Sequence, residues 1–278
     1  MRCTRFHSQY LTKNPSCCWF STTSPSRHTR SRCKRANKCH APPTRATADV
    51  FALDFDGVLV DSEPEISSSA IAAASEYWPE EFGHLDDAAN HQVRHNLRQV
   101  RPVLVNGVEA LVMARMVLED PSCTDSIIHD WQSLLPATLK QWGVEQKDLQ
   151  SFFEDFRNNL LQNHEDKWVK RHVMYPGLQE TLKNCKHPWQ ILNKPMVKEQ
   201  NATVHFVDDR YETVKAVAAE PSLSPIRVYM ADWGYSTQAE KEAAKDTKGV
   251  RLISLTEFQE LLKWGILMGV DDGCGDDN

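Results

Sequence analysis

Long apolar runs are missing from this sequence of 278 residues. A helix that spans a bilayer needs about twenty consecutive, mostly apolar residues, and the longest late stretch, WGILMGV at 264–270, is far shorter. We therefore expect no membrane partner. The length is sufficient for one large domain or two modest ones.

Acidic residues are absent from the first 48 positions. This segment holds ten of the 32 Lys and Arg residues and none of the 38 Asp and Glu residues, and it is rich in Ser and Thr. The composition is typical of an organelle transit peptide, and the Ser and Thr content favours the chloroplast over the mitochondrion. We expect residues 1–48 to be a disordered transit peptide. A basic arm or a wrongly assigned start is the alternative.

Basic residues and cysteines are scarce in the rest of the chain. From position 49 onward, 22 Lys and Arg stand against 38 Asp and Glu, a formal charge of −16. So acidic a body argues against nucleic acid as a partner. Five of the eight cysteines lie in the leader, which leaves Cys123, Cys185 and Cys274. These few thiols indicate a reducing compartment.

Strand-like segments occur near position 51 and then only after position 188. The later ones are WQIL at 189–192, TVHFVDD at 203–209, IRVYMA at 226–231 and VRLIS at 250–254. Helical patterns separate the last three strands, and another follows them. Strands that alternate with helices predict an α/β fold with a doubly wound, Rossmann-like parallel sheet.

A long helical region interrupts this pattern. We expect residues 64–174 to form an all-helical cap domain, inserted into an α/β core of residues 49–63 and 175–265. Its first helix is expected to start near Ile66, with the serines around position 68 as caps. The Gly- and Asp-rich tail at 266–278 is expected to be disordered.

Two pairs of aspartates close two of the predicted strands. Asp54 and Asp56 end FALDFDG, and Asp208 and Asp209 end VHFVDD. Ligands bind at the carboxyl ends of strands in open α/β sheets, and like charges placed together need a cation or a shared proton. Either pair alone fits a turn or a helix cap. Two pairs on one sheet favour a Mg²⁺ site.

Two motifs and their spacing resemble a known family. LDFDGVLVDSEPE is similar to the first motif of the haloacid dehalogenase superfamily, and HFVDDRYET is similar to its fourth. The helical insertion between them matches the cap that many members carry, and the likeness extends from about Val50 to Leu262. The spacing of WP, HFVDDR and ADWGYST resembles a plant and algal branch of predicted plastid members.

The resemblance implies roles for the aspartates. Asp54 would be the nucleophile that accepts a phosphoryl group, and Asp56 would protonate the leaving oxygen and then activate water. Asp54, the backbone carbonyl of Asp56, Asp208 and Asp209 would bind Mg²⁺. An aspartate at the second position points to phosphoryl transfer rather than dehalogenation. We expect a phosphatase whose partner is a small phosphorylated metabolite, hydrolysed through a phosphoaspartate.

One expected motif is incomplete. The superfamily places a phosphate-binding Ser or Thr after the cap, but none occurs between Thr181 and Thr203. Asn193 occupies or adjoins that place, so the expected phosphate-binding residues are Gly57 and Asn193. Lys194 resembles the catalytic lysine of the third motif. A lysine at the solvent-facing start of a helix is the alternative reading.

The segment around Asn193 is also short. Ten residues, from Asn193 to Ala202, leave room for a single crossover where the superfamily has two helices and a strand. Three explanations for the short segment stay open: a deletion in this lineage, a gene prediction that lacks an exon, and a degenerate enzyme. We favour the second. Because ten residues cannot supply a further strand with two crossovers, we expect the sheet to lack one outer strand. Two other functions stay open, a non-catalytic binding or regulatory protein of this fold and a phosphomutase, and the oligomeric state is unknown.

The insertion carries basic residues on one expected helix. His91 and His95 have the spacing of a metal pair, and Arg94, Arg98 and Arg101 could meet an anionic substrate. We expect all five to lie on a solvated face, because the surrounding sequence is polar.

Overall fold

The computed structural model describes residues 48–191, 202–223 and 226–267. The predicted leader at 1–48 lies outside these ranges except for Ala48, and the tail at 266–278 lies outside except for its first two residues. Asn193, Lys194 and the predicted shortage of an outer strand also fall on residues outside the described ranges, so these expectations stay predictions.

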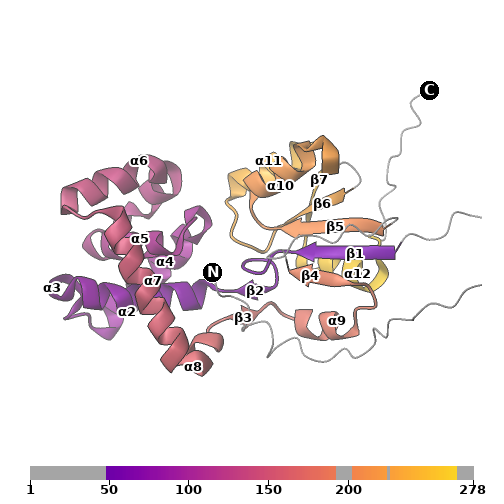
Figure 1. The fold of residues 1–278 in the computed structure, drawn as a ribbon. Coiled ribbons are helices and arrows are strands. Elements are labelled where there is room, and N and C mark those ends of the chain that lie inside the picture. Colours follow the sequence, from indigo (N-terminus) through magenta and orange to yellow (C-terminus); the bar gives the residue numbers. More distant parts are fainter. Residues whose placement is uncertain (1–47, 192–201, 224–225, 268–278) are drawn as a thin grey trace, which may run out of the picture. The chain divides into compact units, whose positions relative to one another are not determined.

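A five-stranded parallel sheet forms the α/β core (Figure 1). Its strands, in spatial order, are β4 (Trp189–Ile191), β1 (Ala48–Leu53), β5 (Ala202–Asp208), β6 (Ile226–Ala231) and β7 (Val250–Ile253). The register pairs Leu53 of β1 with Val207 of β5. The two strands that carry the aspartates are therefore neighbours and end side by side.

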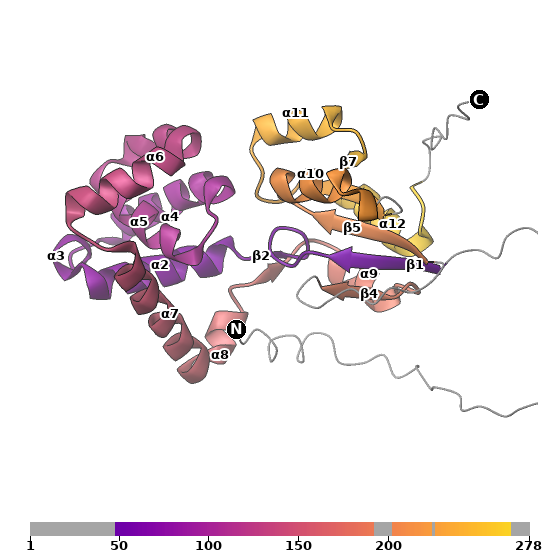
Figure 2. The same cartoon turned by 45° about the horizontal axis from the view of Figure 1, so that its top comes forward.

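Helices cover both faces of the sheet. Figures 1 and 2 show α10 (Tyr211–Ala219) and α11 (Gln238–Asp246) on one side, and α9 (Leu178–Asn184) on the other. Side chains of a strand alternate between faces, so Phe51 packs into the cluster that includes α9 and α12 (Leu255–Trp264), while Ala52 packs into that of α10. A short 3₁₀ turn, η3 (Pro221–Leu223), follows α10. The predicted doubly wound sheet is confirmed.

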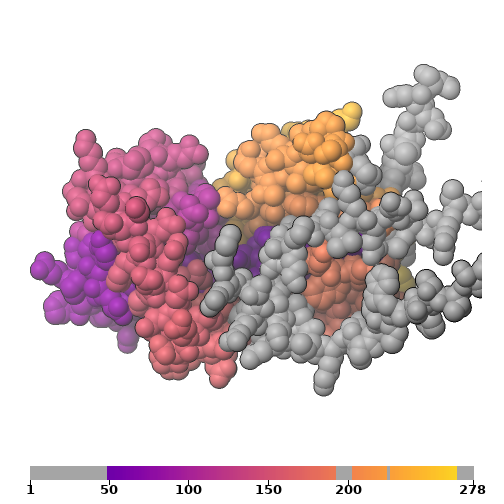
Figure 3. All heavy atoms as spheres, viewed as in Figure 1, coloured from indigo at the N-terminus to yellow at the C-terminus, as the bar shows by residue number. Residues whose placement is uncertain are grey.

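The insertion begins and ends at a small antiparallel ribbon. This ribbon pairs β2 (Val60–Asp61) with β3 (Val173–Met174). Between them lie α2 (Glu63–Tyr77), α3 (Pro79–Phe82), α4 (Asp87–Val100), η1 (Arg101–Val103), α5 (Gly107–Glu119), η2 (Pro121–Cys123), α6 (Thr124–Trp142), α7 (Gln146–Asn163) and α8 (Glu165–Val169). Within residues 63–169, all of which the structure describes, every element is helical. Figure 3 shows the atoms of this insertion in purple to pink.

The insertion has a hydrophobic core of its own. Trp78, Trp131, Leu111 and Ile127 are buried in one cluster that draws only on helices of the insertion and the turns between them. The small residues of α2 let α5 approach closely, because Ala70, Ala73 and Ala74 are fully buried. The insertion therefore folds around side chains that the sheet does not supply.

The first helix of the insertion starts earlier than the sequence predicts. α2 begins at Glu63 rather than near Ile66, and Ser67 and Ser69 hydrogen bond to glutamates one turn before them inside the helix instead of capping it. The free backbone N–H groups at the helix start find other acceptors: the N–H of Ser62 donates to the Tyr235 hydroxyl at 2.7 Å, and the N–H of Glu63 donates to Asp61 at 3.1 Å.

In the described part of the chain, no helix combines the length and the apolar composition needed to cross a membrane.

Candidate active site

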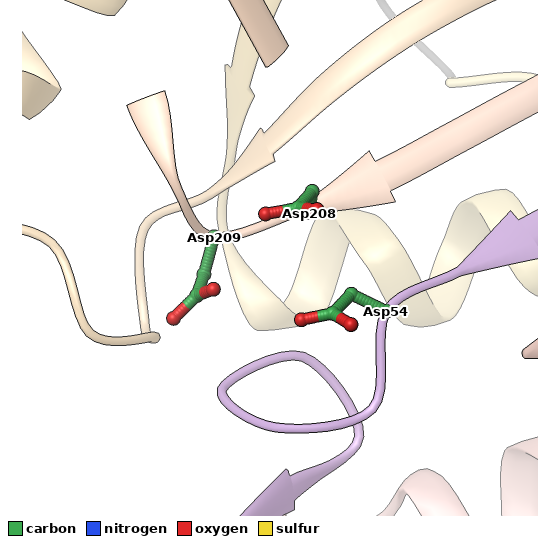
Figure 4. A group of neighbouring side chains, drawn as sticks. All are labelled: Asp54, Asp208 and Asp209. Atoms are coloured by element: carbon green, nitrogen blue, oxygen red, sulfur yellow. The ribbon is translucent and has the colours of Figure 1, made fainter. Parts of the chain in front are cut away.

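Three aspartates converge at the carboxyl ends of β1 and β5. Asp54 follows β1, and its backbone N–H donates to the carbonyl of Val207 at 2.9 Å. Asp208 is the last residue of β5, and Asp209 follows it. Carboxylate oxygens of Asp54, Asp208 and Asp209 all lie within 4.8 Å of one another. Figure 4 shows the three side chains directed into one shared space.

These carboxylates are crowded in a partly dry environment. Burial raises the pKa of Asp54 to about 7, and the neighbouring charges of Asp208, Asp209 and Asp56 add to the increase. Burial also raises the pKa of Asp209 to about 6, against a hydrogen bond from the backbone of Tyr235. The charge of Arg101 lowers the pKa of Asp209 in part, yet the pKa of both carboxyl groups stays above the usual range.

A hard divalent cation fits this donor set. Three carboxylates on two rigid strand ends present oxygen ligands close to one another, which is the chemistry that Mg²⁺ prefers when it also binds a phosphate. A cation held there would offset both the burial and the repulsion that raise the pKa of Asp54. The residues present therefore fit the ion that the sequence predicts.

Two glycines make room for Asp209. Gly57 has a φ of 83°, and a Cβ atom placed on it would lie 2.0 Å from Oδ2 of Asp209. A Cβ atom on Gly234 would lie 2.3 Å from Cβ of Asp209. Next to Gly234, the backbone N–H of Tyr235 donates to Oδ2 of Asp209 at 2.5 Å. The structure therefore gives a steric reason for glycine at position 57. The phosphate contact predicted for Gly57 stays a prediction.

The turn after β1 brings Asp56 to the same opening as Asp54. The N–H of Gly57 donates to the carbonyl of Val60 at 2.9 Å, and the N–H of Val60 donates to the carbonyl of Phe55 at 3.0 Å. This closed turn leaves Asp56 exposed, while both aspartates line one pocket. Asp56 is therefore accessible to water and to a ligand.

The pocket joins the strand ends to the insertion. It has a volume of about 210 Å³. Its lining residues are Asp54, Asp56, Asp209, Arg210 and Tyr235 from the core, and Arg101, Pro102, Leu104 and Val105 from the insertion. The insertion therefore supplies one wall of the candidate active site.

The basic residues of the insertion have different surroundings. Arg101 is half-buried, and its guanidinium lies 3.8 Å from the centroid of the Tyr235 ring. The prediction of a solvated face is therefore wrong for Arg101, because η1 brings it over the core. His91 and His95 are exposed, as predicted, and Arg98 forms ion pairs with Asp61 and Glu63 at the junction between core and insertion.

Tyr235 links the aspartate cluster to the insertion. Its hydroxyl donates to Asp61 at 2.7 Å and accepts the backbone N–H groups of Ser62 and Glu63. Burial, together with the hydrogen bond to Asp61, raises the pKa of the Tyr235 hydroxyl, so it stays protonated and can donate. Tyr235 thus contacts the start of α2 through its hydroxyl and Asp209 through its backbone N–H.

Sequence reasoning missed several lining residues. Arg210 and Tyr235 were not singled out as site residues, and Gly234 was not given a role. The position of Arg210 directly after the aspartate pair was a usable signal, as was the glycine in ADWGYST. Nothing in the sequence placed Tyr235 beside Asp61, because that contact depends on the tertiary fold.

Comparisons with known proteins yield two structural neighbours. No protein-family model matches the sequence, and no curated protein matches it. A candidate phosphoglycolate phosphatase from Lactobacillus delbrueckii subsp. bulgaricus is 11% identical, with 80% of this chain and 100% of that chain covered and a TM-score of 0.41. A predicted phosphatase from Clostridium acetobutylicum is 11% identical, with 78% and 98% covered and a TM-score of 0.42.

Both neighbours are described as phosphatases. At this identity and TM-score they do not identify the activity of this chain. Neither comes from a plant or an alga, so the expected likeness to a plant and algal plastid branch gains no support.

Proposed function

We propose that the chain is a Mg²⁺-dependent phosphatase of the haloacid dehalogenase type that hydrolyses a small phosphate monoester. The observation that carries the proposal is the convergence of Asp54, Asp208 and Asp209 at the ends of two adjacent parallel strands, with carboxylate oxygens within 4.8 Å of one another. A nucleophilic carboxylate beside two further acids is an arrangement suited to phosphoryl transfer with a metal ion.

The metal ligands follow from the same geometry. Asp54, Asp208 and Asp209 would hold the ion, together with the backbone carbonyl of Asp56 that the sequence predicts. When bound, Mg²⁺ supplies the positive charge that offsets the carboxylates and the negative charge of the phosphate. Gly57 and Gly234 leave room for Asp209, because larger residues would collide with it.

The chemical steps use two aspartates. A carboxylate oxygen of Asp54 attacks phosphorus, the bond from phosphorus to the leaving oxygen breaks, and Asp56 gives that oxygen a proton. Asp56 then takes a proton from water, whose oxygen attacks the phosphoaspartate, so that inorganic phosphate leaves and Asp54 is regenerated. Asp56 suits this proton transfer because it is exposed and lines the same pocket as Asp54.

The test is the Asp54→Asn variant. Loss of the nucleophile is expected to lower kcat by roughly a thousandfold or more, measured as phosphate release from a panel of phosphate monoesters with Mg²⁺. Asp232→Asn is a matched control, because Asp232 follows β6 as Asp54 follows β1 but does not line the pocket. Trapping of ³²P on the wild-type chain, and its absence in Asp54→Asn, would identify the phosphoaspartate.

A second candidate is a non-catalytic binding protein of the same fold. The observation in its favour is the absence of Ser and Thr between Thr181 and Thr203, where the resemblance places a phosphate-binding hydroxyl. A wild-type chain that binds Mg²⁺ but releases phosphate from no member of a broad panel would support this candidate. Net transfer of phosphate within a sugar, without free phosphate, would instead indicate a phosphomutase.

We also propose that residues 1–48 direct the protein to the chloroplast. The support is their Ser- and Thr-rich composition without acidic residues. A fluorescent reporter fused to residues 1–50 is expected to enter chloroplasts of plant cells. Retention of the reporter in the cytosol would contradict this, and entry into mitochondria would favour the alternative organelle.

A further inference from the structure

The pocket has two walls of different chemistry. The strand ends supply the aspartates that the proposed function assigns to the metal ion and the phosphoryl group. The other wall is residues 101–105, the segment between α4 and α5, of which Arg101, Pro102, Leu104 and Val105 line the pocket. With the phosphoryl group at Asp54, this segment is left to contact the rest of the substrate.

We propose that Arg101 binds a second anionic group, a carboxylate or a phosphate, on the leaving group of the substrate. The inference rests on the proposed function and narrows its substrates to small phosphate monoesters that carry a negative charge at each end.

Arg101 makes no direct ion pair in the part of the chain that the structure describes, although its charge lowers the pKa of nearby Asp209. Three residues earlier, Arg98 pairs with Asp61 at 2.7 Å and with Glu63 at 2.8 Å. In the ranges that the structure describes, no ion pair involves Arg101, and its Nε is buried without a hydrogen-bond acceptor. The guanidinium charge therefore lines the pocket without an ion-pair partner, and an anion in the pocket would supply that partner.

The orientation of Arg101 is fixed by Tyr235. The guanidinium carbon lies over the tyrosine ring, 3.8 Å from its centroid, and the ring is held through its hydroxyl by Asp61 and by the N–H of Ser62. The ring occupies one side of the guanidinium, and the planar fork of donors on an arginine matches the two oxygens of a carboxylate or a phosphate. The site is therefore organised before a ligand binds.

The rest of the segment indicates a small substrate with a short carbon skeleton. Leu104 is buried, and Val105 is 56% exposed although it is a large apolar side chain. The pocket volume of about 210 Å³ lies below the usual range for drug-sized ligands, roughly 300 Å³ upward. An apolar strip beside one arginine suits a few methylene groups that end in an anion.

Buried contacts hold this segment in place. The backbone N–H of Val105 donates to Oε2 of Glu109 at 2.9 Å, and the indole N–H of Trp131 donates to the same oxygen at 3.1 Å. Glu109 is 5% exposed, so these bonds are shielded from water. Arg101 and Leu104 are therefore parts of a fixed wall.

The experiment compares matched substrates. Carboxyalkyl phosphates of two to four carbons, alkyl bisphosphates and neutral hydroxyalkyl phosphates of the same lengths are assayed for kcat/KM with Mg²⁺. We expect the wild-type chain to favour an anionic series over the neutral one by about tenfold or more, the value of one good charge-assisted contact. Arg101→Gln is expected to remove this preference, whereas Arg98→Gln, a matched loss of a nearby arginine, retains it.

The outcomes are distinct. A preference ratio that is unchanged in Arg101→Gln, or an equal fall for neutral and anionic esters, would overturn the proposal, because Arg101 would then have no role or would contact the transferred phosphoryl group. The series that shows the larger preference tells whether the second anion is a carboxylate or a phosphate.

Calorimetry separates this inference from the proposed function. Carboxyalkyl phosphates and bisphosphates are titrated with Mg²⁺ into Asp54→Asn and into Asp54→Asn/Arg101→Gln. Binding that weakens by about tenfold or more in the double variant supports the role of Arg101, even if the wild-type chain hydrolyses nothing and the phosphatase proposal fails. Equal binding by both proteins would refute the role of Arg101 whether or not hydrolysis occurs.

Discussion

Buried carboxylates are treated in opposite ways in the insertion and in the core. In the insertion, Glu65 is 1% exposed and accepts hydrogen bonds from Ser69, Arg157 and Trp168 at 2.6–2.7 Å. Its negative charge is matched by a guanidinium and two further donors. These partners join α2 to α7 and α8, and the charge of Glu65 is paired within the insertion.

In the core, three carboxylates are gathered, and in the ranges that the structure describes none of them forms an ion pair. The charges of Arg210 and Arg101 lower the pKa of Asp208 and Asp209 only in part. Asp208 and Asp209 are buried, and burial raises the pKa of both, with Asp208 adding to the increase at Asp209. Buried carboxylates that lie this close together lower the stability of the folded chain unless a cation or a proton binds them. Both groups of acids are buried, so burial alone does not distinguish a structural carboxylate from one that can bind a ligand. The difference lies in whether hydrogen-bond donors and cations already pair with the carboxylate.

The largest expected effect on folding is at the paired site. Glu65→Ala leaves the charge of Arg157 without its partner, and breaking a buried ion pair typically costs about 3–5 kcal/mol of unfolding free energy. Denaturant unfolding measures this, with Glu154→Ala as the control, since Glu154 is an exposed glutamate on α7. A cost for Glu65→Ala no greater than that of the control would break the comparison.

The second prediction concerns the crowded site. Mg²⁺ is expected to raise the unfolding free energy of the wild-type chain by up to about 2.7 kcal/mol at a hundredfold excess over Kd, because the aspartates converge only in the folded state. Asp208→Asn is expected to lose most of this gain, while it should not destabilise the metal-free chain, since it removes a crowded charge. Thermal unfolding with Mg²⁺ and with EDTA measures both effects.

Asp232→Asn serves as the control for that measurement, because Asp232 lies at another strand end and outside the cluster. Equal stabilisation of wild type, Asp208→Asn and Asp232→Asn by Mg²⁺ would show that the ion binds elsewhere.

The smallest effect is expected at the amino end of the sheet. His205 is fully buried between Asp49 and Tyr229, at 3.0 and 3.2 Å. Burial lowers the pKa of His205 below its usual value of 6.5. Below pH 6.5 the unfolded chain therefore binds a proton that the folded chain does not. The unfolding free energy consequently decreases as the pH is lowered, by at most about 1.4 kcal/mol per pH unit.

His205→Gln isolates this contribution. The difference in unfolding free energy between the wild-type chain and His205→Gln, measured at pH 7 and at pH 5, cancels the titration of other groups such as Asp54. We expect the wild-type chain to lose more stability than the variant over this interval. A difference that does not change with pH would mean that His205 is as easily protonated in the folded chain as in the unfolded one.

The parts of the site that follow from strand order were predictable. Asp54 and Asp208 end apolar runs, and parallel pairing of adjacent strands brings such ends together. The residues that depend on the insertion were not predictable. Arg101 stands in a polar stretch that resembles a solvated helix face, and only the path of η1 over the core brings it to Tyr235.

Local rules also failed where a distant group satisfied the backbone. The sequence favoured serine caps for α2, but the helix starts at Glu63 because the Tyr235 hydroxyl, far along the chain, accepts two of its first N–H groups. The roles of Asn193 and Lys194 stay predictions, since both residues lie outside the described ranges.

The fit of Gly57 and Gly234 around Asp209 limits how this site can change over evolutionary time. The two glycines are far apart in the sequence, yet an added methyl group on either would meet the same carboxylate. Neither position can acquire a side chain while Asp209 stays where it is, so we expect selection to remove single substitutions at either glycine. In any lineage that keeps the aspartate cluster, we expect both glycines to be inherited together. Loss of Asp209 alone would free neither position, because Gly57 has a φ of 83° and a Cβ atom on Gly234 would also lie 2.6 Å from the carbonyl oxygen of Gly57.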